Sequence, residues 1–339
     1  MATQNLIFTK PNILLVCQAG AGIGLGHLMR SLVSARALRD ILGSNVILIV
    51  QGAEIESSLC AEFEHTILSS TKNLLDAISV KIKDNGIDVL ILDLFPQQVP
   101  ADLCGALELW RTAGCKLVAV DGLITLRDRL DLIFLPSFCC PSIDIRLPSA
   151  RIVYGWDCLI LNVDDVAPAG PKGDQVLVLT GGSDTTKLGK LWPNLLDNRL
   201  PSRSEVHWVT GPFAGRPVLP VNPRLKWYEH IAPQNLKNLM SQTNFALTVY
   251  GVSFFELLHY GVASVVFSPY GLKDKAELSA IASSGLALVA EDERDAIERM
   301  LDLINNKELA IKLSAQARDK LRVPGTKRLC FEVYELVNC

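Results

Sequence analysis

The residue with the clearest chemical potential is a histidine that follows a glycine-rich segment. His27 comes directly after glycines at alternating positions, which are Gly20, Gly22, Gly24 and Gly26. Apolar residues then recur at helical spacing, so His27 is expected in the first turn of a helix. The positive end of a helix dipole disfavours the imidazolium, and a neutral imidazole is the form that a general base needs. We predict that His27 is a catalytic base, with a turn cap or a packed wall residue as the alternative.

The glycine segment itself predicts an anion site, because a strand at 12–17 runs into it and a helix follows. A dinucleotide fingerprint is not matched, since Leu25 stands where a third glycine is required after Gly20 and Gly22. A P-loop is not matched either, because no Gly-Lys pair follows. These departures disfavour nicotinamide and ATP sites. Arg30, one turn beyond His27, is expected to hold a carboxylate or phosphate, or to form a structural salt bridge.

Two aspartates end predicted strands of the same half. Asp93 ends the strand at 89–93, and Asp121 ends the strand at 117–121. Open α/β sheets bind ligands at the carboxyl ends of their strands. Each aspartate is therefore a candidate ligand contact or the cap of a loop.

The second half of the chain contains two similar turns. Gly181-Gly182-Ser183-Asp184 follows a strand at 176–179, and Gly251-Val252-Ser253 follows a strand at 245–249. Gly251 allows a close approach of the backbone to a ligand, and Ser253 is expected to cap a helix that starts there. Such a helix N-terminus would stabilise a diphosphate without a metal. Glu256, one turn in, is expected to accept hydrogen bonds from a ribose diol or to compensate the helix dipole.

The elements that position these residues are short apolar strands alternating with helical patterns, which predicts parallel, doubly wound α/β sheets. The strands are expected at 12–17, 46–50, 89–93, 117–121 and 132–135, and again at 176–179, 206–209, 225–228, 245–249, 264–267 and 287–289. Residues 162–174 follow neither period and are the expected linker. We predict an N-terminal domain at 1–165, a C-terminal domain at 170–325, and a tail at 326–339 that packs back on the first domain.

Composition points to a soluble protein with small-molecule partners. The chain has 339 residues, of which 49% are hydrophobic and 20% charged, and its net charge of −3 offers no field for capturing nucleic acid. The nine cysteines include no C-x-x-C pair, and no signal peptide is visible. We therefore expect reduced thiols and a cytoplasmic location. No apolar run approaches the roughly 18 residues that a membrane span needs.

Taken in order, the motifs resemble those of the PseG/SpsG proteins, the UDP-sugar hydrolases of pseudaminic acid synthesis and their spore-coat relatives. The resemblance covers most of the chain, and its most specific part is Gly26-His27-Leu-Met29-Arg30. The other matching segments are Leu90–Leu94, Tyr154-Gly155-Trp156, Gly181–Asp184 and Gly251-x-Ser253-x-x-Glu256-Leu257 with Gly261 after it. That family is similar to the glycosyltransferase that adds N-acetylglucosamine to lipid I. The resemblance thus implies a GT-B fold, with two Rossmann-like domains that face a central cleft.

The resemblance also implies roles for individual residues. His27 matches the catalytic histidine. The implied nucleotide contacts are Gly181, Gly182, Ser183, Asp184, Gly251, Val252, Ser253 and Glu256, together with a turn at His230-Ile231 where uracil is bound by backbone groups. The implied contacts to the donor sugar or the acceptor are Gly24, Gly26, Arg30, Asp93, Phe95, Lys273, Asp274 and Glu277.

Three departures from the hydrolase pattern affect the predicted substrate. Phe95 replaces a tyrosine, Lys273–Glu277 replaces an Asn-Gln pair, and Val252 replaces the second glycine of the diphosphate turn. The groups that would handle donor sugar and water are thus altered, while the base and the nucleotide contacts remain.

These observations predict an inverting, metal-independent glycosyl transfer from a nucleotide-diphosphate sugar, most simply a UDP-sugar, to a sugar or lipid-linked hydroxyl. No cofactor is expected, and the setting would be surface polysaccharide or glycoconjugate biosynthesis. One alternative is a PseG-like hydrolase that releases free sugar and UDP. The other is a catalytically silent subunit that binds a nucleotide sugar.

Overall fold

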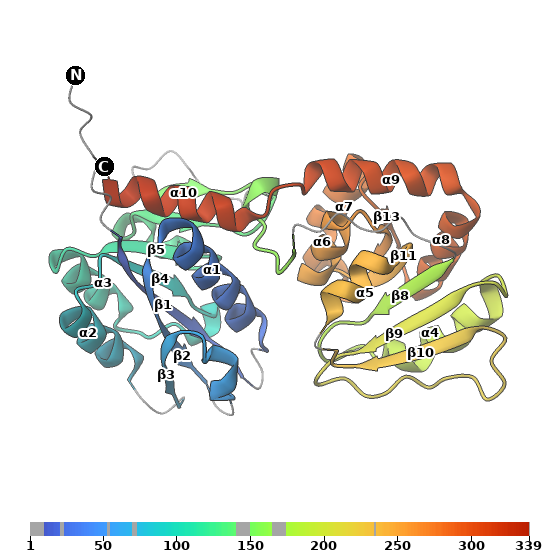
Figure 1. The fold of residues 1–339 in the computed structure, drawn as a ribbon, viewed down its shortest axis with the longest axis horizontal. Coiled ribbons are helices and arrows are strands. Elements are labelled where there is room, and N and C mark those ends of the chain that lie inside the picture. The colour runs from blue at the N-terminus through green and yellow to red at the C-terminus, as the bar shows by residue number, and fades with distance from the viewer. Residues whose placement is uncertain are drawn as a thin grey trace, which may run out of the picture. The chain divides into compact units, whose positions relative to one another are not determined.

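The computed structural model describes residues 10–20, 24–52, 55–69, 73–139, 150–164, 174–233 and 235–338. The chain forms two compact units (Figure 1). One unit combines Met1–Leu161 with Val323–Cys339, and the other is Asn162–Arg322. Within the described part of the chain, no helix combines the length and the apolar character that a membrane crossing requires.

The N-terminal unit is built on a seven-stranded parallel sheet in the order β3-β2-β1-β4-β5-β6-β7. Its strands are β1 (Asn12–Gln18), β2 (Asn45–Gln51), β3 (Glu64–Leu68), β4 (Val89–Asp93), β5 (Lys116–Val120), β6 (Leu132–Phe134) and β7 (Arg151–Val153). The central strands have continuous apolar runs bounded by polar residues, as expected for a sheet that helices cover on both faces.

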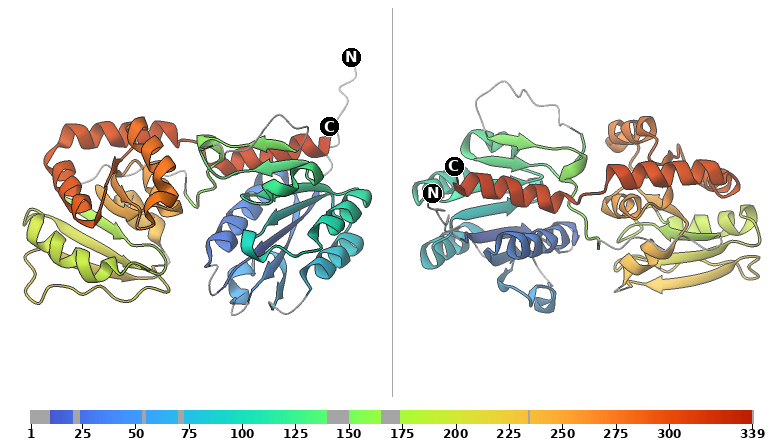
Figure 2. Two further views of the ribbon diagram at one scale, coloured as in Figure 1. Left: turned by 180° about the vertical axis from the view of Figure 1, so that it is seen from behind. Right: turned by 45° about the horizontal axis from the view of Figure 1, so that its top comes forward.

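Two helices lie on each face of this sheet (Figures 1 and 2). One face packs against α1 (Gly26–Leu42) and α10 (Gly325–Asn338), and the other packs against α2 (Leu74–Asn85) and α3 (Leu103–Thr112). The end of the chain joins this unit because Leu329, Cys330 and Val333 of α10 are buried in its core. Short 3-10 helices complete the unit at η1 (Ser57–Cys60), η2 (Pro96–Gln98), η3 (Ile124–Arg129) and η4 (Trp156–Cys158).

The C-terminal unit has a six-stranded parallel sheet in the order β10-β9-β8-β11-β12-β13. The strands are β8 (Gln175–Leu179), β9 (Glu205–Thr210), β10 (Lys226–Ile231), β11 (Phe245–Val249), β12 (Ala263–Phe267) and β13 (Leu288–Val289). The helices are α4 (Leu188–Arg199), α5 (Leu236–Gln242), α6 (Val252–His259), η5 (Gly271–Asp274), α7 (Lys275–Ser284), α8 (Glu293–Asn305) and α9 (Lys307–Lys320). Side chains of α4, α8 and α9 fill the core on one face, and those of α5 and α6 fill it on the other.

Both sheets reverse their strand order at one place. The first strand of each unit, β1 or β8, lies between the second strand and the fourth, so successive connections run in opposite directions from it. Ligands of doubly wound sheets bind outside the carboxyl ends of the strands at this switch point. The predicted α/β architecture is therefore confirmed. Ligand sites are expected at the carboxyl ends of β1 and β4 and of β8 and β11.

Candidate functional site

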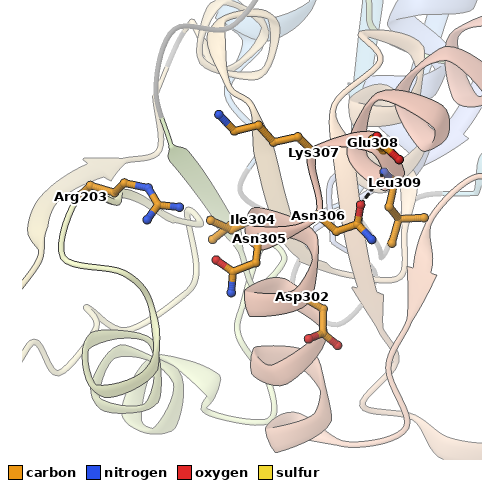
Figure 3. A pocket seen from close by; sticks show the side chains of 8 residues that line it. All are labelled: Arg203, Asp302, Ile304, Asn305, Asn306, Lys307, Glu308 and Leu309. Atoms are coloured by element: carbon orange, nitrogen blue, oxygen red, sulfur yellow. Dashed lines mark hydrogen bonds between the residues drawn. The ribbon is translucent and has the colours of Figure 1, made fainter.

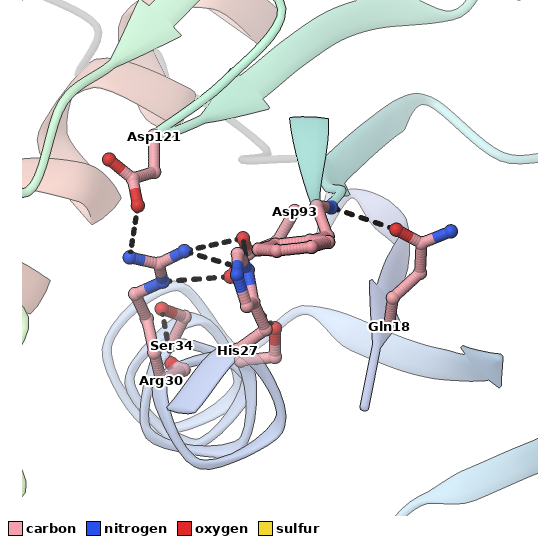
Figure 4. A network of polar contacts seen from close by, with 8 residues as sticks. Gln18, His27, Arg30, Ser34, Asp93 and Asp121 are labelled. Carbon is pink, nitrogen blue, oxygen red and sulfur yellow. Dashed lines mark hydrogen bonds and ion pairs between the residues drawn. The ribbon is translucent and has the colours of Figure 1, made fainter. Parts of the chain in front are cut away.

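The site of the N-terminal unit centres on His27 and Asp93, which the strand order brings together. His27 is the second residue of α1, and Asp93 is the last residue of β4, the strand beside β1. The Nδ1 atom of His27 lies 2.6 Å from Oδ1 of Asp93 (Figure 4). The Asp93 side chain is only 2% exposed, whereas His27 is 16% exposed. The ring is therefore held from inside the protein, and its outer edge reaches the surface.

The contacts of Nδ1 bear on the tautomer of His27. Nη2 of Arg30 lies 3.0 Å from Nδ1, but the Asp93 carboxylate is nearer at 2.6 Å and only accepts hydrogen bonds, so we assign the proton to Nδ1. The Nε2 atom is then the nitrogen that can take up a proton. A carboxylate behind an imidazole also stabilises the imidazolium that forms during base catalysis. This influence acts against that of the helix dipole.

Arg30 completes the group by binding two carboxylates. Its Nε donates to Oδ2 of Asp93 at 2.8 Å and its Nη2 donates to Oδ1 at 2.6 Å, which is a bidentate pair. Its Nη1 donates to Asp121 at 2.8 Å. The guanidinium thus makes internal ion pairs, the structural alternative that the sequence left open, and these contacts raise the pKa of Arg30.

Asp93 is ionised despite its burial. Burial by itself raises the pKa of a carboxyl group, but the charge of Arg30 and the hydrogen bonds from His27 and Arg30 outweigh it and hold the pKa of Asp93 below its ordinary value. Ser31 adds a longer hydrogen bond to Oδ2 at 3.4 Å. The base is therefore paired with a fixed negative charge at neutral pH.

Phe95 forms an apolar surface beside His27. The two ring centroids are 6.0 Å apart, and the ring planes meet at 82°. The backbone N–H of Phe95 donates to Oε1 of Gln18 at 2.8 Å, and the Gln18 amide in turn donates to Gln51 at 2.8 Å. Gln18 is buried and was missed by the sequence analysis, although a polar residue at the end of an apolar strand was a usable signal.

Some backbone groups of the glycine segment before His27 form hydrogen bonds within the segment. Gly20 and Gly24 exchange two hydrogen bonds, at 3.2 Å and 2.8 Å. Gly24 has a φ of 82°, which favours glycine at that position. Gly26 is the first residue of α1, and Gly22 lies outside the described residues. The N–H group of each of Gly20 and Gly24 therefore donates to the carbonyl oxygen of the other in this structure.

In the C-terminal unit, the turn at Gly181–Asp184 follows β8 as predicted, but Asp184 has a local role. Its two carboxylate oxygens accept the backbone N–H groups of Leu188 and Gly189, both at 2.9 Å. These contacts satisfy N–H groups in the first turn of α4. The carboxylate that was assigned to the nucleotide is thus engaged by the helix, while Gly181, Gly182 and Ser183 remain exposed.

The predicted cap of the next helix is wrong. Gly251 occupies the N-cap position of α6, so Ser253 is the second helical residue, and no side chain caps this end. Val252, the first helical residue, is 52% exposed. The first turn of α6 therefore presents backbone N–H groups without a side-chain acceptor, as a diphosphate site at this position requires.

Glu256 lies one turn into α6 and is already hydrogen-bonded. Its Oε1 accepts the backbone N–H of Asn162 at 3.1 Å. Burial raises the pKa of Glu256 to about 7, an effect that the Asn162 N–H and the charge of Lys237 only partly offset. One carboxylate oxygen therefore holds the chain at the entry to this unit, which the sequence analysis did not foresee.

The expected turn at His230-Ile231 is wrong, because both residues belong to β10, which continues to Ile231. His230 stacks on His207 with ring centroids 5.4 Å apart, and Nδ1 of His207 lies 3.1 Å from Nε2 of His230. Ile231 is 55% exposed. The turn begins one residue later, at Ala232, whose φ is 38°.

The charged segment Lys273–Glu277 follows β12. Lys273 and Asp274 end η5, and Glu277 lies in the first turn of α7. Asp274 accepts a hydrogen bond from Ser268 at 2.5 Å. The Nζ atom of Lys273 lies 5.6 Å from the centroid of the Tyr270 ring, which is a cation–π distance.

A separate hollow of about 790 Å³ lies where α8 meets α9 (Figure 3). It is lined by Arg203, Asp302, Ile304, Asn305, Asn306, Lys307, Glu308 and Leu309. None of the residues predicted from the sequence contributes to it. Among the described residues, no group of three or more His, Cys, Asp and Glu side chains is placed to hold a metal ion.

Comparison with known proteins identifies the fold. No family model and no curated protein matches the sequence. Among solved structures, UGT2 of Phytolacca americana has a TM-score of 0.67 at 14% identity, covering 96% of this chain and 99% of that chain. MurG of Acinetobacter baumannii has a TM-score of 0.64 at 15% identity, covering 97% and 99%. The spinosyn rhamnosyltransferase SpnG has a TM-score of 0.61 at 13% identity, covering 95% and 100%.

The chain therefore has the GT-B fold of these glycosyltransferases, which confirms the predicted fold class. The resemblance to PseG/SpsG proteins is not confirmed, because no family model matches the chain.

Proposed function

We propose that this protein is an inverting glycosyltransferase that uses a nucleotide-diphosphate sugar and no metal. The observation that carries the proposal is the pairing of His27, a partly exposed side chain, with buried Asp93 through Nδ1, which leaves Nε2 to accept a proton. Structural neighbours support the substrate class. The structure of UGT2 is a complex with UDP-2-fluoro-glucose and pterostilbene, and that of SpnG is a complex with thymidine diphosphate.

In the proposed reaction the two units have different roles. Nε2 of His27 takes the proton of an acceptor hydroxyl while that oxygen attacks the anomeric carbon. The bond from the anomeric carbon to the diphosphate oxygen breaks, and the nucleoside diphosphate leaves. Asp93 stabilises the imidazolium, and the N–H groups in the first turn of α6 stabilise the leaving diphosphate. A single displacement of this kind inverts the configuration at the anomeric carbon.

Transfer is favoured over hydrolysis by the surroundings of His27. The Phe95 ring meets the imidazole edge to face and has no group that could hydrogen-bond a water molecule. A nucleophilic water needs hydrogen-bond partners to be oriented. An aromatic face suits a sugar ring or the apolar part of an acceptor. Hydrolysis remains the second candidate, supported by the Gly26-His27-x-Met29-Arg30 segment that resembles the hydrolases.

The first step of the test finds the donor. Thermal shift with UDP, GDP, CMP and dTDP sugars should show a raised melting temperature for the donor class that binds the folded protein. The best-binding sugar nucleotide is then incubated with the protein, first alone and then with candidate acceptors. Release of nucleoside diphosphate that depends on an acceptor, with the sugar found on that acceptor, is the expected result. Rapid appearance of free sugar in the acceptor-free reaction would establish hydrolysis instead.

The role of His27 is tested by His27→Gln, with His65→Gln as the matched control. His65 lies on β3 in the same unit and is hydrogen-bonded to Ser57, far along the sheet from β4. Loss of a general base lowers the rate by about 10²–10⁴, whereas nucleotide affinity should hardly change. Near-normal turnover in His27→Gln would exclude His27 as the base.

A further inference from the structure

A hydroxyl pair links two loops of the C-terminal unit across the end of β11. Thr185 belongs to the loop after β8, and Tyr270 belongs to the loop after β12. Their side-chain oxygens are 3.1 Å apart. In the sheet, β11 lies between β8 and β12, so the two strands from which these loops start are two strand spacings apart, or about 10 Å. The hydroxyl contact therefore bridges the two loops over the end of β11. The helix α6 starts directly after β11, at Val252. The hydroxyl pair therefore lies at the same edge of the sheet as the uncapped first turn of α6.

A cation accompanies this pair. Lys273 lies on the same loop as Tyr270, with its ammonium group 5.6 Å from the centroid of the tyrosine ring. The loop is held by its own hydrogen bonds, because Ser268 accepts the N–H of Tyr270 at 3.2 Å and donates to Asp274 at 2.5 Å. Thr185, Tyr270 and Lys273 are nonetheless exposed to solvent. The arrangement combines a hydrogen-bonded loop with exposed polar side chains.

We infer that Thr185, Tyr270 and Lys273 bind the second phosphate of the nucleotide, the one that bears the sugar. This inference rests on the proposed function and names the side chains that recognise the second phosphate of the nucleoside diphosphate sugar. A first phosphate uses the N–H groups of α6. When the second phosphate binds, the hydrogen bond between the two hydroxyl groups breaks. Each hydroxyl group then donates a hydrogen bond to an oxygen of that phosphate. Lys273 supplies positive charge for the additional negative charge.

The chemistry of these groups favours phosphate over other ligands. Hydroxyl and ammonium groups donate hydrogen bonds, and a phosphate offers several charged acceptor oxygens. Asp274 is the acidic residue beside Lys273, and one of its carboxylate oxygens accepts a hydrogen bond from Ser268. When the sugar departs, its former phosphate carries the charge that develops, so the same three side chains would also stabilise the leaving group.

The test compares diphosphates with monophosphates by calorimetric titration of the full chain. UDP, dTDP, GDP and CDP are titrated with their monophosphates, and the base that binds most tightly is used afterwards. We expect wild-type protein to prefer the diphosphate. Thr185→Val, Tyr270→Phe and Lys273→Met should each weaken diphosphate binding by about tenfold, the scale of a lost charged hydrogen bond. Monophosphate affinity should stay unchanged.

Neighbouring exposed residues provide matched controls. Thr186→Val follows Thr185 directly, and Lys275→Met lies two residues beyond Lys273. Both should keep the preference for the diphosphate. If the wild-type protein prefers the diphosphate and all three test variants keep that preference, the inference is wrong while the proposed function stands. If the wild-type protein binds no nucleoside diphosphate, both are wrong.

Discussion

Arg30 donates a hydrogen bond from Nη1 to Asp121 at 2.8 Å, and this ion pair ties the helix that carries His27 to the end of β5. Asp121 has a φ of 65°, a backbone conformation that only asparagine, aspartate and glycine adopt readily. Its side chain is 48% exposed. Arg30 is therefore paired with the half-exposed carboxylate of Asp121 and with the buried carboxylate of Asp93.

Asp121→Asn should lower turnover by a small factor, about three- to tenfold, by loosening Arg30 and with it the orientation of His27. Asparagine keeps the left-handed backbone, and a half-exposed ion pair contributes little to stability. Steady-state kinetics and melting temperature measure the two effects separately. Asp128→Asn, an exposed residue in the following 3-10 helix, is the control. Equal turnover in both variants would show that Asp121 does not position the site.

Asp93→Asn should lower turnover by about 10²–10⁴ with little change in nucleotide affinity. The amide no longer stabilises an imidazolium, and it can donate to Nδ1, which favours the wrong tautomer of His27. Loss of the carboxylate also leaves Arg30 without its buried partner, at a cost of roughly 3–5 kcal/mol in stability. Kinetics and denaturant unfolding should therefore both change. Full activity in the folded variant would separate Asp93 from the chemistry.

The same carboxylate predicts a pH effect on stability. The pKa of Asp93 in the folded protein is below its ordinary value of 3.8, so its contribution is present above that value and is lost as the pH falls through the folded pKa. Wild-type protein should therefore lose stability more steeply than Asp93→Asn when the pH falls below about 4. Parallel unfolding curves for the two proteins would contradict the assignment.

Glu256 predicts a dependence of opposite sign. Its pKa is raised from 4.5 to about 7 in the folded protein, so the folded state binds more protons than the unfolded state between these values. Stability contributed by this group is complete below pH 4.5 and declines until the pH passes about 7. Glu256→Gln keeps an acceptor for the Asn162 N–H but does not ionise. Its melting temperature relative to wild type should rise across this window, whereas Glu308→Gln, an exposed substitution on α9, should show no such trend.

Gly211 is not itself a predicted ligand contact, so a substitution there tests the turn after β8 indirectly. A Cβ atom on Gly211 would lie 2.5 Å from the carbonyl oxygens of both Gly181 and Gly182. Gly211→Ala should therefore displace that turn, lower stability by about 1–3 kcal/mol and weaken nucleotide binding. Gly215→Ala is the matched control in the same loop, since a Cβ there meets nothing within 4 Å. Unfolding and nucleotide titration should distinguish the two variants.

The sequence by itself determined the architecture and the local placement of several site residues. Apolar runs and helical periods are local patterns, so they predicted two parallel sheets and put His27 in the first turn of α1. The edge strands β3 and β7 escaped prediction. Both have half-exposed, mixed sequences without the continuous apolar character of the central strands. The position of Ser253 in α6 was misjudged because helix boundaries depend on contacts beyond the local sequence.

Only the tertiary structure decided which groups meet. Asp93 lies 66 residues from His27 in sequence, and Asn162 lies 94 residues from Glu256. The contacts of both residues arise because the strand order puts β1 beside β4, and because the chain enters the C-terminal unit beside α6. No local sequence pattern predicts either arrangement, because the order of strands in a sheet depends on the packing of the whole unit. A charged side chain whose partner cannot be read from the sequence forms an ion pair or a hydrogen bond where it is buried, because an unpaired buried charge is costly.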